Sequence, residues 1–304
     1  MAAAAIVVGS LFAVQSRING ELGRELGNGM LAAAISFLSG LVVLGLLMTV
    51  RPTMRAGLAT VRAGLRGGAL RPWQCLGGIG GAALVASQAL TVGVLGVALF
   101  TVGVVAGQTV SGLIVDKIGL GPAGRQASTV TRMAGALLTL CGVAIALSGG
   151  IRVIGGLGLV VLPLLAGVGI AVQQAINGRV GVTAGNALTA SLVNFGIGSV
   201  VLVIASAVAM IAAYGLPSEL PGNPVVYLGG LIGVVFISAA AYLVRPLGVL
   251  LFGLCTIAGQ LIGSVLLDLV VPVQGQPLAT STVIGAALTL VAVGIASVPV
   301  RGRS

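Results

Sequence analysis

Apolar residues run along this chain in continuous stretches of about twenty, separated by short segments that carry most of the charged residues. That length matches the roughly 30 Å hydrocarbon core of a bilayer, where each backbone amide and carbonyl needs a partner within the protein. Strands of a membrane barrel would alternate polar and apolar residues over about ten positions, and these stretches do not alternate. The pattern predicts an all-α integral membrane protein with ten transmembrane helices, at 2–20, 30–50, 73–91, 95–116, 130–148, 154–176, 187–213, 224–244, 247–271 and 280–299.

The two halves of the sequence are similar to each other. Shifted by 158 residues, 15–40 aligns with 173–198 at 10 of 26 positions without a gap. Shifted by 152 residues, 95–116 aligns with 247–268 through the frame LGV-x-LF-x5-AGQ-x7-D. We therefore expect two repeats of five helices, 1–150 and 151–304. Because five is odd, the second repeat would cross the membrane in the opposite sense, which makes an inverted-topology repeat. At the first offset the start of the sixth helix would fall before Met1, so either the first helix is short or the true start lies upstream.

Composition agrees with a membrane protein, since 58% of the residues are hydrophobic, 7% are charged and the mean hydropathy is +1.20. The net charge of +10 could indicate nucleic-acid binding, but the basic residues lie between the apolar stretches, as they do in cytoplasmic loops. With the N-terminus inside, twelve of the fifteen Lys and Arg residues lie on the cytoplasmic side and three lie outside, and segment 51–72 alone holds five arginines. We expect both termini in the cytoplasm and no nucleic-acid partner.

Cofactor and metal chemistry find no support in the sequence. Cys75, Cys141 and Cys255 lie in or beside apolar stretches without disulfide or zinc spacing, and histidine is absent. No GxxxxGK[ST] motif offers a nucleotide site, so ATP-driven pumping is not indicated. A membrane-embedded enzyme acting on lipids would need a nucleophile, a base or a metal set, and the sequence offers no histidine and no paired carboxylates for that chemistry. We expect no cofactor, no metal and no enzymatic activity.

Glycine accounts for 50 of the 304 residues. Small residues let membrane helices approach each other closely. Pairs at small-xxx-small spacing, such as Gly77/Gly81 and Gly103/Gly107, are therefore interpreted as packing positions.

The repeated motifs resemble those of a known group of transporters. Q-x3-NG closing the first helix, ING-x2-G-x3-GN and AGQ-x7-D along the fourth helix are similar to the drug/metabolite transporter superfamily, and most of all to its YdcZ-like branch in tandem-fused form. The resemblance covers nearly the whole chain. It implies an EamA-like fold of ten helices around a central cavity in the bacterial inner membrane, and it implies no particular substrate. Single-repeat relatives pair as dimers, so we expect a monomer or a homodimer. Small multidrug-resistance relatives carry a glutamate in the middle of the first helix; this chain has none there, which disfavours a proton-coupled cation exchanger.

Polar side chains inside the apolar stretches recur at matching repeat positions. Such residues are costly in a membrane, so each is a candidate site residue, although amides also hold helices together. On the first and sixth helices they stand at i, i+4 spacing and share a face, and the fourth and ninth helices repeat this arrangement. We expect them either to line one solute cavity or to clamp the two halves together: Gln15, Asn19, Gln108, Gln173, Asn177, Gln260, Ser264 and, without an amide counterpart, Asn194.

Two aspartates, Asp116 and Asp268, occupy equivalent repeat positions at opposite membrane faces. Each could close the cavity at its own face, or act in coupling, by pairing with a nearby basic residue, such as Arg17 or Arg152 for Asp268. Simple anchoring at the membrane interface is the alternative.

Taken together, these features favour a secondary transporter that exports a small metabolite or drug-like solute across the bacterial inner membrane by alternating access. A channel and a non-transporting membrane scaffold are the alternatives, and a lipid-modifying enzyme ranks last. The bilayer is the expected partner, while substrate, coupling ion and direction stay open.

Overall fold

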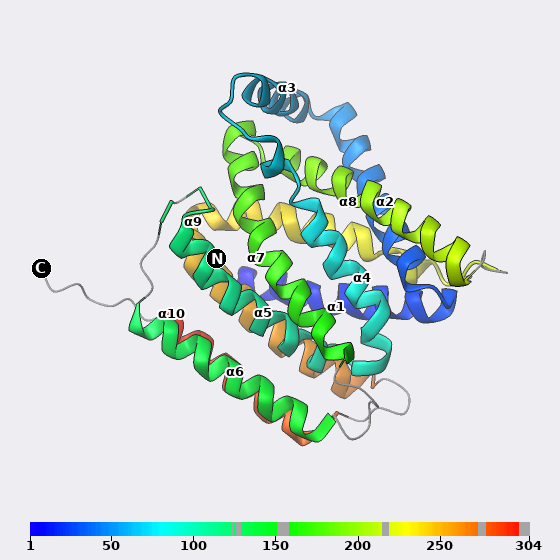
Figure 1. Ribbon diagram of the computed structural model, residues 1–304, viewed down its shortest axis with the longest axis vertical. Helices are drawn as coiled ribbons and strands as arrows, with labels where there is room; N and C mark the ends of the chain where they lie inside the picture. Colours follow the sequence, from blue (N-terminus) through cyan, green and yellow to red (C-terminus); the bar gives the residue numbers. More distant parts are fainter. Residues whose placement is uncertain (123, 126–128, 151–157, 215–218, 273–277, 298–304) are drawn as a thin grey trace, which may run out of the picture.

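The computed structural model describes residues 1–122, 124–125, 129–150, 158–214, 219–272 and 278–297. Over this part of the chain the regular structure is entirely helical, and each predicted span coincides with a helix over most of its described length. The elements in Figure 1 are α1 (Ala2–Leu26), α2 (Gly29–Val50), α3 (Pro52–Arg66), α4 (Gly78–Leu95), α5 (Val97–Ile118), α6 (Val130–Gly150), α7 (Gly158–Ala184), α8 (Ala187–Ala209), α9 (Gly229–Val270) and α10 (Thr280–Ser297), with 3-10 turns η1 (Pro72–Cys75) and η3 (Pro224–Tyr227) and a π-helical turn, η2 (Met210–Tyr214).

Several helical stretches are long and apolar enough to cross a membrane. Five of full length are present among the described residues, at Gly29–Val50, Pro72–Leu95, Val97–Ile118, Gly158–Ala184 and Ala187–Ala212. Shorter apolar helices cover Met133–Ala146, Gly229–Ala239, Cys255–Val270 and Thr280–Ile295. Large apolar side chains such as Leu46 and Val200 are exposed on these helices, as expected where lipid replaces water. The predicted all-helical membrane class is thus confirmed.

The repeated Gly-Asn pair of the sequence is a helix junction in both halves. Gly27 (φ 59°) and Gly185 (φ 61°) end α1 and α7 in the left-handed conformation, which glycine adopts without steric cost. The next residue caps the following helix. Oδ1 of Asn28 accepts a hydrogen bond from an amide in the first turn of α2 at 3.0 Å, and Oδ1 of Asn186 accepts one in α8 at 2.9 Å. The motif is therefore a tight turn that joins two helices of each half.

The two predicted spans 224–244 and 247–271 meet in one helix. α9 runs without interruption for 42 residues. Figure 1 shows that it changes direction, because its first part (yellow) and its last part (orange) run along different lines. Pro246 lies between these two parts. A proline inside a helix removes one backbone hydrogen bond and bends the helix without always ending it.

Segment 51–72, expected as a basic loop, contains α3. Pro52 stands in the first turn, where its missing amide proton costs nothing. Met54, Gly57 and Val61 fall on one helix face and are buried. The hydroxyl of Thr189 in α8 donates to the carbonyl of Met54 at 3.2 Å and holds α3 to the bundle. α3 was not predicted because it has only 15 residues and is apolar on one face only, so it lacks a continuous apolar stretch of membrane length.

Helices from different halves pack in pairs. α1 lies against α9, α5 against α7 and α2 against α8, while α6 and α10 run side by side at one edge of the bundle (Figure 1). Gly107 of α5 lies against the backbone carbonyl of Leu164 in α7, and Gly259 of α9 lies against that of Ile6 in α1. A Cβ at either glycine would overlap the neighbouring backbone. Gly77, Gly81 and Gly103 lie against side chains of α2 and α7 with less than ordinary contact distance left for a Cβ, which agrees with the interpretation of these glycines as packing positions.

Candidate functional site

The polar residues of α1 lie in a buried group between α1, α4 and the start of α9. Nδ2 of Asn19 donates to Oε1 of Gln88 at 2.7 Å, and Nε2 of Gln88 donates to the hydroxyl of Ser16 at 2.9 Å. Nε2 of Gln15 donates to the carbonyl of Gly229 at 3.1 Å. All four side chains are buried. We call Gln15, Ser16, Asn19 and Gln88 the first-half cluster.

A second group joins α7 to α8. Oδ1 of Asn194 accepts hydrogen bonds from Nε2 of Gln173 and from Nδ2 of Asn177, both at 2.9 Å. Gln173 and Asn194 are buried, and Asn177 is half-buried. The repeat counterpart of Asn194 is Ser36, which has no amide to offer, and the first half satisfies its own asparagine with Gln88 of α4 instead. We call Gln173, Asn177 and Asn194 the second-half cluster.

Glycines place the equivalent asparagines against a neighbouring segment in both halves. A Cβ on Gly229 would overlap Oδ1 of Asn19, and a Cβ on Gly77 would overlap Oδ1 of Asn177. Gly229 and Gly77 are related by the sequence offset of 152, and the two asparagines by the offset of 158. The amide faces recognised in the sequence therefore sit in matching surroundings.

Both clusters retain buried polar atoms for which the described residues supply no hydrogen-bond partner. These atoms are Oδ1 of Asn19, Oε1 of Gln173 and Nδ2 of Asn194. A buried polar atom without a partner costs about 1–3 kcal/mol. Water or a polar solute bound at these atoms would recover that cost, so the clusters combine interhelical bonding with unused hydrogen-bonding capacity.

The polar residues predicted on the fourth and ninth helices, which are α5 and the second part of α9, are not members of either cluster. Nε2 of Gln108 donates to Oε1 of Gln174 at 3.3 Å at an exposed position between α5 and α7. Ser264 is fully buried and donates to a carbonyl of its own helix at 2.9 Å. Gln260 is buried as well, and its Oε1 has no partner among the described residues. In the part of the chain that is described, no hydrogen bond connects Gln108, Gln260 or Ser264 to either cluster.

Asp268, near the end of α9, caps the first turn of α5. Its Oδ2 accepts a hydrogen bond from the amide of Ala98 at 2.7 Å, next to the turn at Gly96 (φ 76°). The first amides of a helix lack intrahelical partners, and a carboxylate also interacts favourably with the helix dipole. The predicted pairing with Arg17 is not formed in the described structure, where Arg24 and Glu21 make the ion pair. The other predicted partner, Arg152, lies outside the described residues.

The opposite end of α5 is capped by Arg179 of α7. Nε of Arg179 donates to the carbonyl of Leu120 at 2.6 Å, and Nη2 donates to that of Gly119 at 2.9 Å. Gly119 (φ 70°) ends the helix in the left-handed conformation. In the last turn Asp116 is half-buried and Lys117 is exposed.

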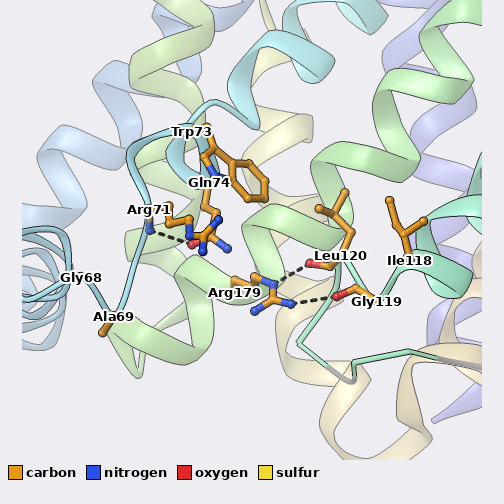
Figure 2. A pocket seen from close by; sticks show the side chains of 9 residues that line it. All are labelled: Gly68, Ala69, Arg71, Trp73, Gln74, Ile118, Gly119, Leu120 and Arg179. Atoms are coloured by element: carbon orange, nitrogen blue, oxygen red, sulfur yellow. Dashed lines mark hydrogen bonds between the residues drawn. The ribbon is translucent and has the colours of Figure 1, made fainter.

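A pocket of about 370 Å³ opens beside this cap. Figure 2 shows Arg71, Trp73 and Gln74 together on one side of it, and Ile118 and Leu120 on the other. Neither amide cluster lines the pocket, which is formed by Gly68, Ala69, Arg71, Trp73, Gln74, Ile118, Gly119, Leu120 and Arg179.

Sequence reasoning missed Gln88 and the basic pocket. Gln88 is a polar side chain inside a predicted span, like Gln15. Its repeat counterpart is Ala240, however, so it does not belong to the polar residues that recur in both halves. The pocket joins the segment after α3 to the ends of α5 and α7, which only the tertiary structure brings together. No group of three or more Cys, Asp or Glu side chains suited to a metal occurs among the described residues.

Comparison with known protein families gives one match. The family is described as "Putative inner membrane exporter, YdcZ", of the drug/metabolite transporter type, and it matches residues 1–145 and 158–295. Two matched segments in one chain correspond to the tandem form. No curated protein matches the sequence.

Proposed function

The chain belongs to the YdcZ family of inner membrane exporters, and from this premise we propose that it is a secondary transporter that exports a small polar solute by alternating access. The family is one of membrane exporters and not of enzymes. The observation that carries the proposal is the pair of amide clusters, which are built around the equivalent asparagines Asn19 and Asn177 of the two halves and keep unused hydrogen-bonding atoms.

Matching contacts support the inverted repeat on which alternating access depends. The rings of Phe37 and Phe195, at equivalent repeat positions, pack with centroids 4.9 Å apart. A Cβ on Gly40 would overlap the ring of Phe195, and a Cβ on the equivalent Gly198 would overlap that of Phe37. Such reciprocal contacts are expected about an axis that relates two halves. We propose ten spans in two five-helix repeats, 1–150 and 151–304, with α9 supplying two of the spans.

The two clusters would serve the solute in turn. When one face of the protein opens, the bond of Asn19 with Gln88 or that of Gln173 with Asn194 would break, and the freed amides would bind a solute stripped of water. Uncharged amides suit a neutral or zwitterionic solute. As α5 and α9 move, the same solute site would also be lined by Gln108, Gln260 and Ser264.

Gating is proposed for the two aspartates. Asp268 fastens the end of α9 to the start of α5 through the amide of Ala98, so separating these helices at that face requires breaking this bond. Asp116 occupies the equivalent position at the other face. Both termini are proposed to lie in the cytoplasm, because the basic residues are concentrated on that side.

The test is transport by the purified protein in liposomes. Uptake of radiolabelled amino acids, nucleosides and sugars is measured for the wild type and for Asn194→Ala, Gln108→Ala and Gln260→Ala. Ser191→Ala is the matched control, because Ser191 is buried on the same helix as Asn194 and its hydroxyl bonds only its own helix. We expect saturable uptake that Asn194→Ala abolishes and Ser191→Ala retains.

Other outcomes would replace this proposal. Flux that rises linearly with solute concentration would indicate a channel. Equal uptake by the wild type and the three site variants would place the solute away from these amides. Absence of any transported solute would favour a scaffold.

A further inference from the structure

We propose that the pocket beside the end of α5 binds the anionic head group of an amphipathic molecule, a carboxylate or phosphate carrying an apolar chain. This site is distinct from the amide clusters and does not depend on the transport proposal.

Two arginines supply the charge. Arg71 precedes η1 and lines the pocket with Arg179 from α7 (Figure 2). The backbone amide of Arg71 donates to Oε1 of Gln74 at 2.8 Å, and its guanidinium makes no hydrogen bond or ion pair among the described residues. Nε and Nη2 of Arg179 donate to the carbonyls at the end of α5, and Nη1 has no hydrogen-bond partner among the described residues. Guanidinium groups bind carboxylates and phosphates through charge-assisted hydrogen bonds.

No acidic residue lines the pocket to neutralise these arginines. Outside the lining, the last turn of α5 carries one charge of each sign, the exposed Lys117 and the half-buried Asp116, so the positive charge of the two arginines in the lining is not offset there. Such an uncompensated positive potential attracts anions and repels cations.

Apolar side chains border the same space. Trp73 is 41% exposed and Ile118 is 56% exposed, and Leu120 completes the lining opposite Trp73. Tryptophan and arginine together are typical of the interfacial region of a membrane, where a ligand can keep its charge in the pocket and its chain among apolar groups. The volume of about 370 Å³ is within the range of small-molecule sites.

Trp73 makes the site directly observable, because it is the single tryptophan of the chain. The protein is placed in nanodiscs of zwitterionic phosphatidylcholine made with a tryptophan-free scaffold protein, and the emission of Trp73 is followed while dodecyl phosphate is added. Dodecyltrimethylammonium, with the same chain and the opposite charge, is the matched probe, and inorganic phosphate tests the head group alone. We expect the tryptophan emission to change saturably as dodecyl phosphate is added. Dodecyltrimethylammonium should bind with a dissociation constant at least about tenfold higher, and inorganic phosphate should also bind more weakly than dodecyl phosphate.

The variants separate a pocket from general surface charge. Arg71→Gln removes a guanidinium that bonds nothing among the described residues, so folding should be retained, and binding of dodecyl phosphate should weaken about tenfold. Arg66→Gln is the control, because Arg66 is an exposed arginine outside the lining. Equal binding of the two dodecyl probes, or equal weakening by the two variants, would overturn the proposal.

A second nanodisc composition distinguishes the sources of the head group. If phosphatidylglycerol in the disc competes with dodecyl phosphate in a way that Arg71→Gln removes, the natural occupant is a lipid. If phosphatidylglycerol leaves dodecyl phosphate binding unchanged, the site selects a soluble amphiphile. Because binding in nanodiscs is measured without transport, this experiment can fail while the transport proposal holds, and the transport proposal can fail while this site binds its ligand.

Discussion

The contact between α5 and α7 makes a definite prediction for Gly107. A Cβ added at this position would meet the carbonyl oxygen and carbon of Leu164 and the amide nitrogen of Val168, and all three atoms belong to the backbone of α7. No side chain can rotate away to admit an added methyl group. Gly107→Ala must therefore push the two helices apart along their contact.

The cost follows from the contacts that are lost. Restoring ordinary van der Waals distance requires the helices to separate by roughly 1.4 Å at this point, and even a gap of about 1 Å removes about half of each atom-pair attraction of about 0.15 kcal/mol. Some 20 such pairs along the contact would then lose about 1.5 kcal/mol. This value lies within the range of about 1–3 kcal/mol for overpacked cores.

Gly112 is the matched control, since it lies on the same helix and a Cβ there would meet nothing within 4 Å. Gly112→Ala should leave stability unchanged or raise it by up to about 1 kcal/mol, through helix propensity. Thermal unfolding in detergent, followed by circular dichroism, should place the midpoint of Gly107→Ala a few degrees below that of Gly112→Ala, at roughly 2 °C per kcal/mol. Equal midpoints would refute the reasoning, because they would mean that α5 and α7 do not touch at Gly107.

Three further predictions concern the site and the topology. Asn194→Ala leaves the amides of Gln173 and Asn177 without their acceptor and should lower the free energy of unfolding by about 1–2 kcal/mol. Ser191→Ala should change it by less than about 0.5 kcal/mol. Thermal shift of the purified variants measures both, and similar shifts would contradict the role of the second-half cluster. Asp268→Ala removes the cap of α5 and should lower the free energy of unfolding by about 1–3 kcal/mol. Backbone amide hydrogen exchange should become faster in the first turn of α5 only, and unchanged exchange there would show that the cap contributes nothing. A cysteine at Arg66 in a cysteine-free background should react with a membrane-impermeant maleimide in inverted vesicles and not in intact cells, and the reverse result would invert the proposed orientation.

The sequence was sufficient for the features that repeat. Hydrophobic stretches of membrane length predicted the helices because a bilayer demands them, and the two offsets identified the segments that later proved to make equivalent contacts. The Gly-Asn junction illustrates this: Gly27 and Asn28 recur as Gly185 and Asn186 because a left-handed turn and a helix cap each accept few residue types.

What the sequence could not supply depends on contacts between distant segments. For Asp268 the sequence suggested pairing with Arg17 or Arg152, or anchoring at the membrane interface, and it could not indicate the backbone amide of Ala98 that the carboxylate caps, because every residue except proline carries such an amide. Gln88 bonds Asn19 although its repeat counterpart is an alanine. The burial of one face of α3 likewise depends on packing against the rest of the bundle.

The unequal pair Asn194 and Ser36 has a consequence for recognition. In a dimer of identical subunits, every substitution on one wall of a central site is copied onto the other, and the site keeps the symmetry of the dimer. Fusing both halves into one chain removes this constraint, because each half accumulates mutations on its own. In this chain the halves differ at the position where three amides meet, so under the proposed transport function the two clusters would bind the two ends of an asymmetric molecule with different chemistry.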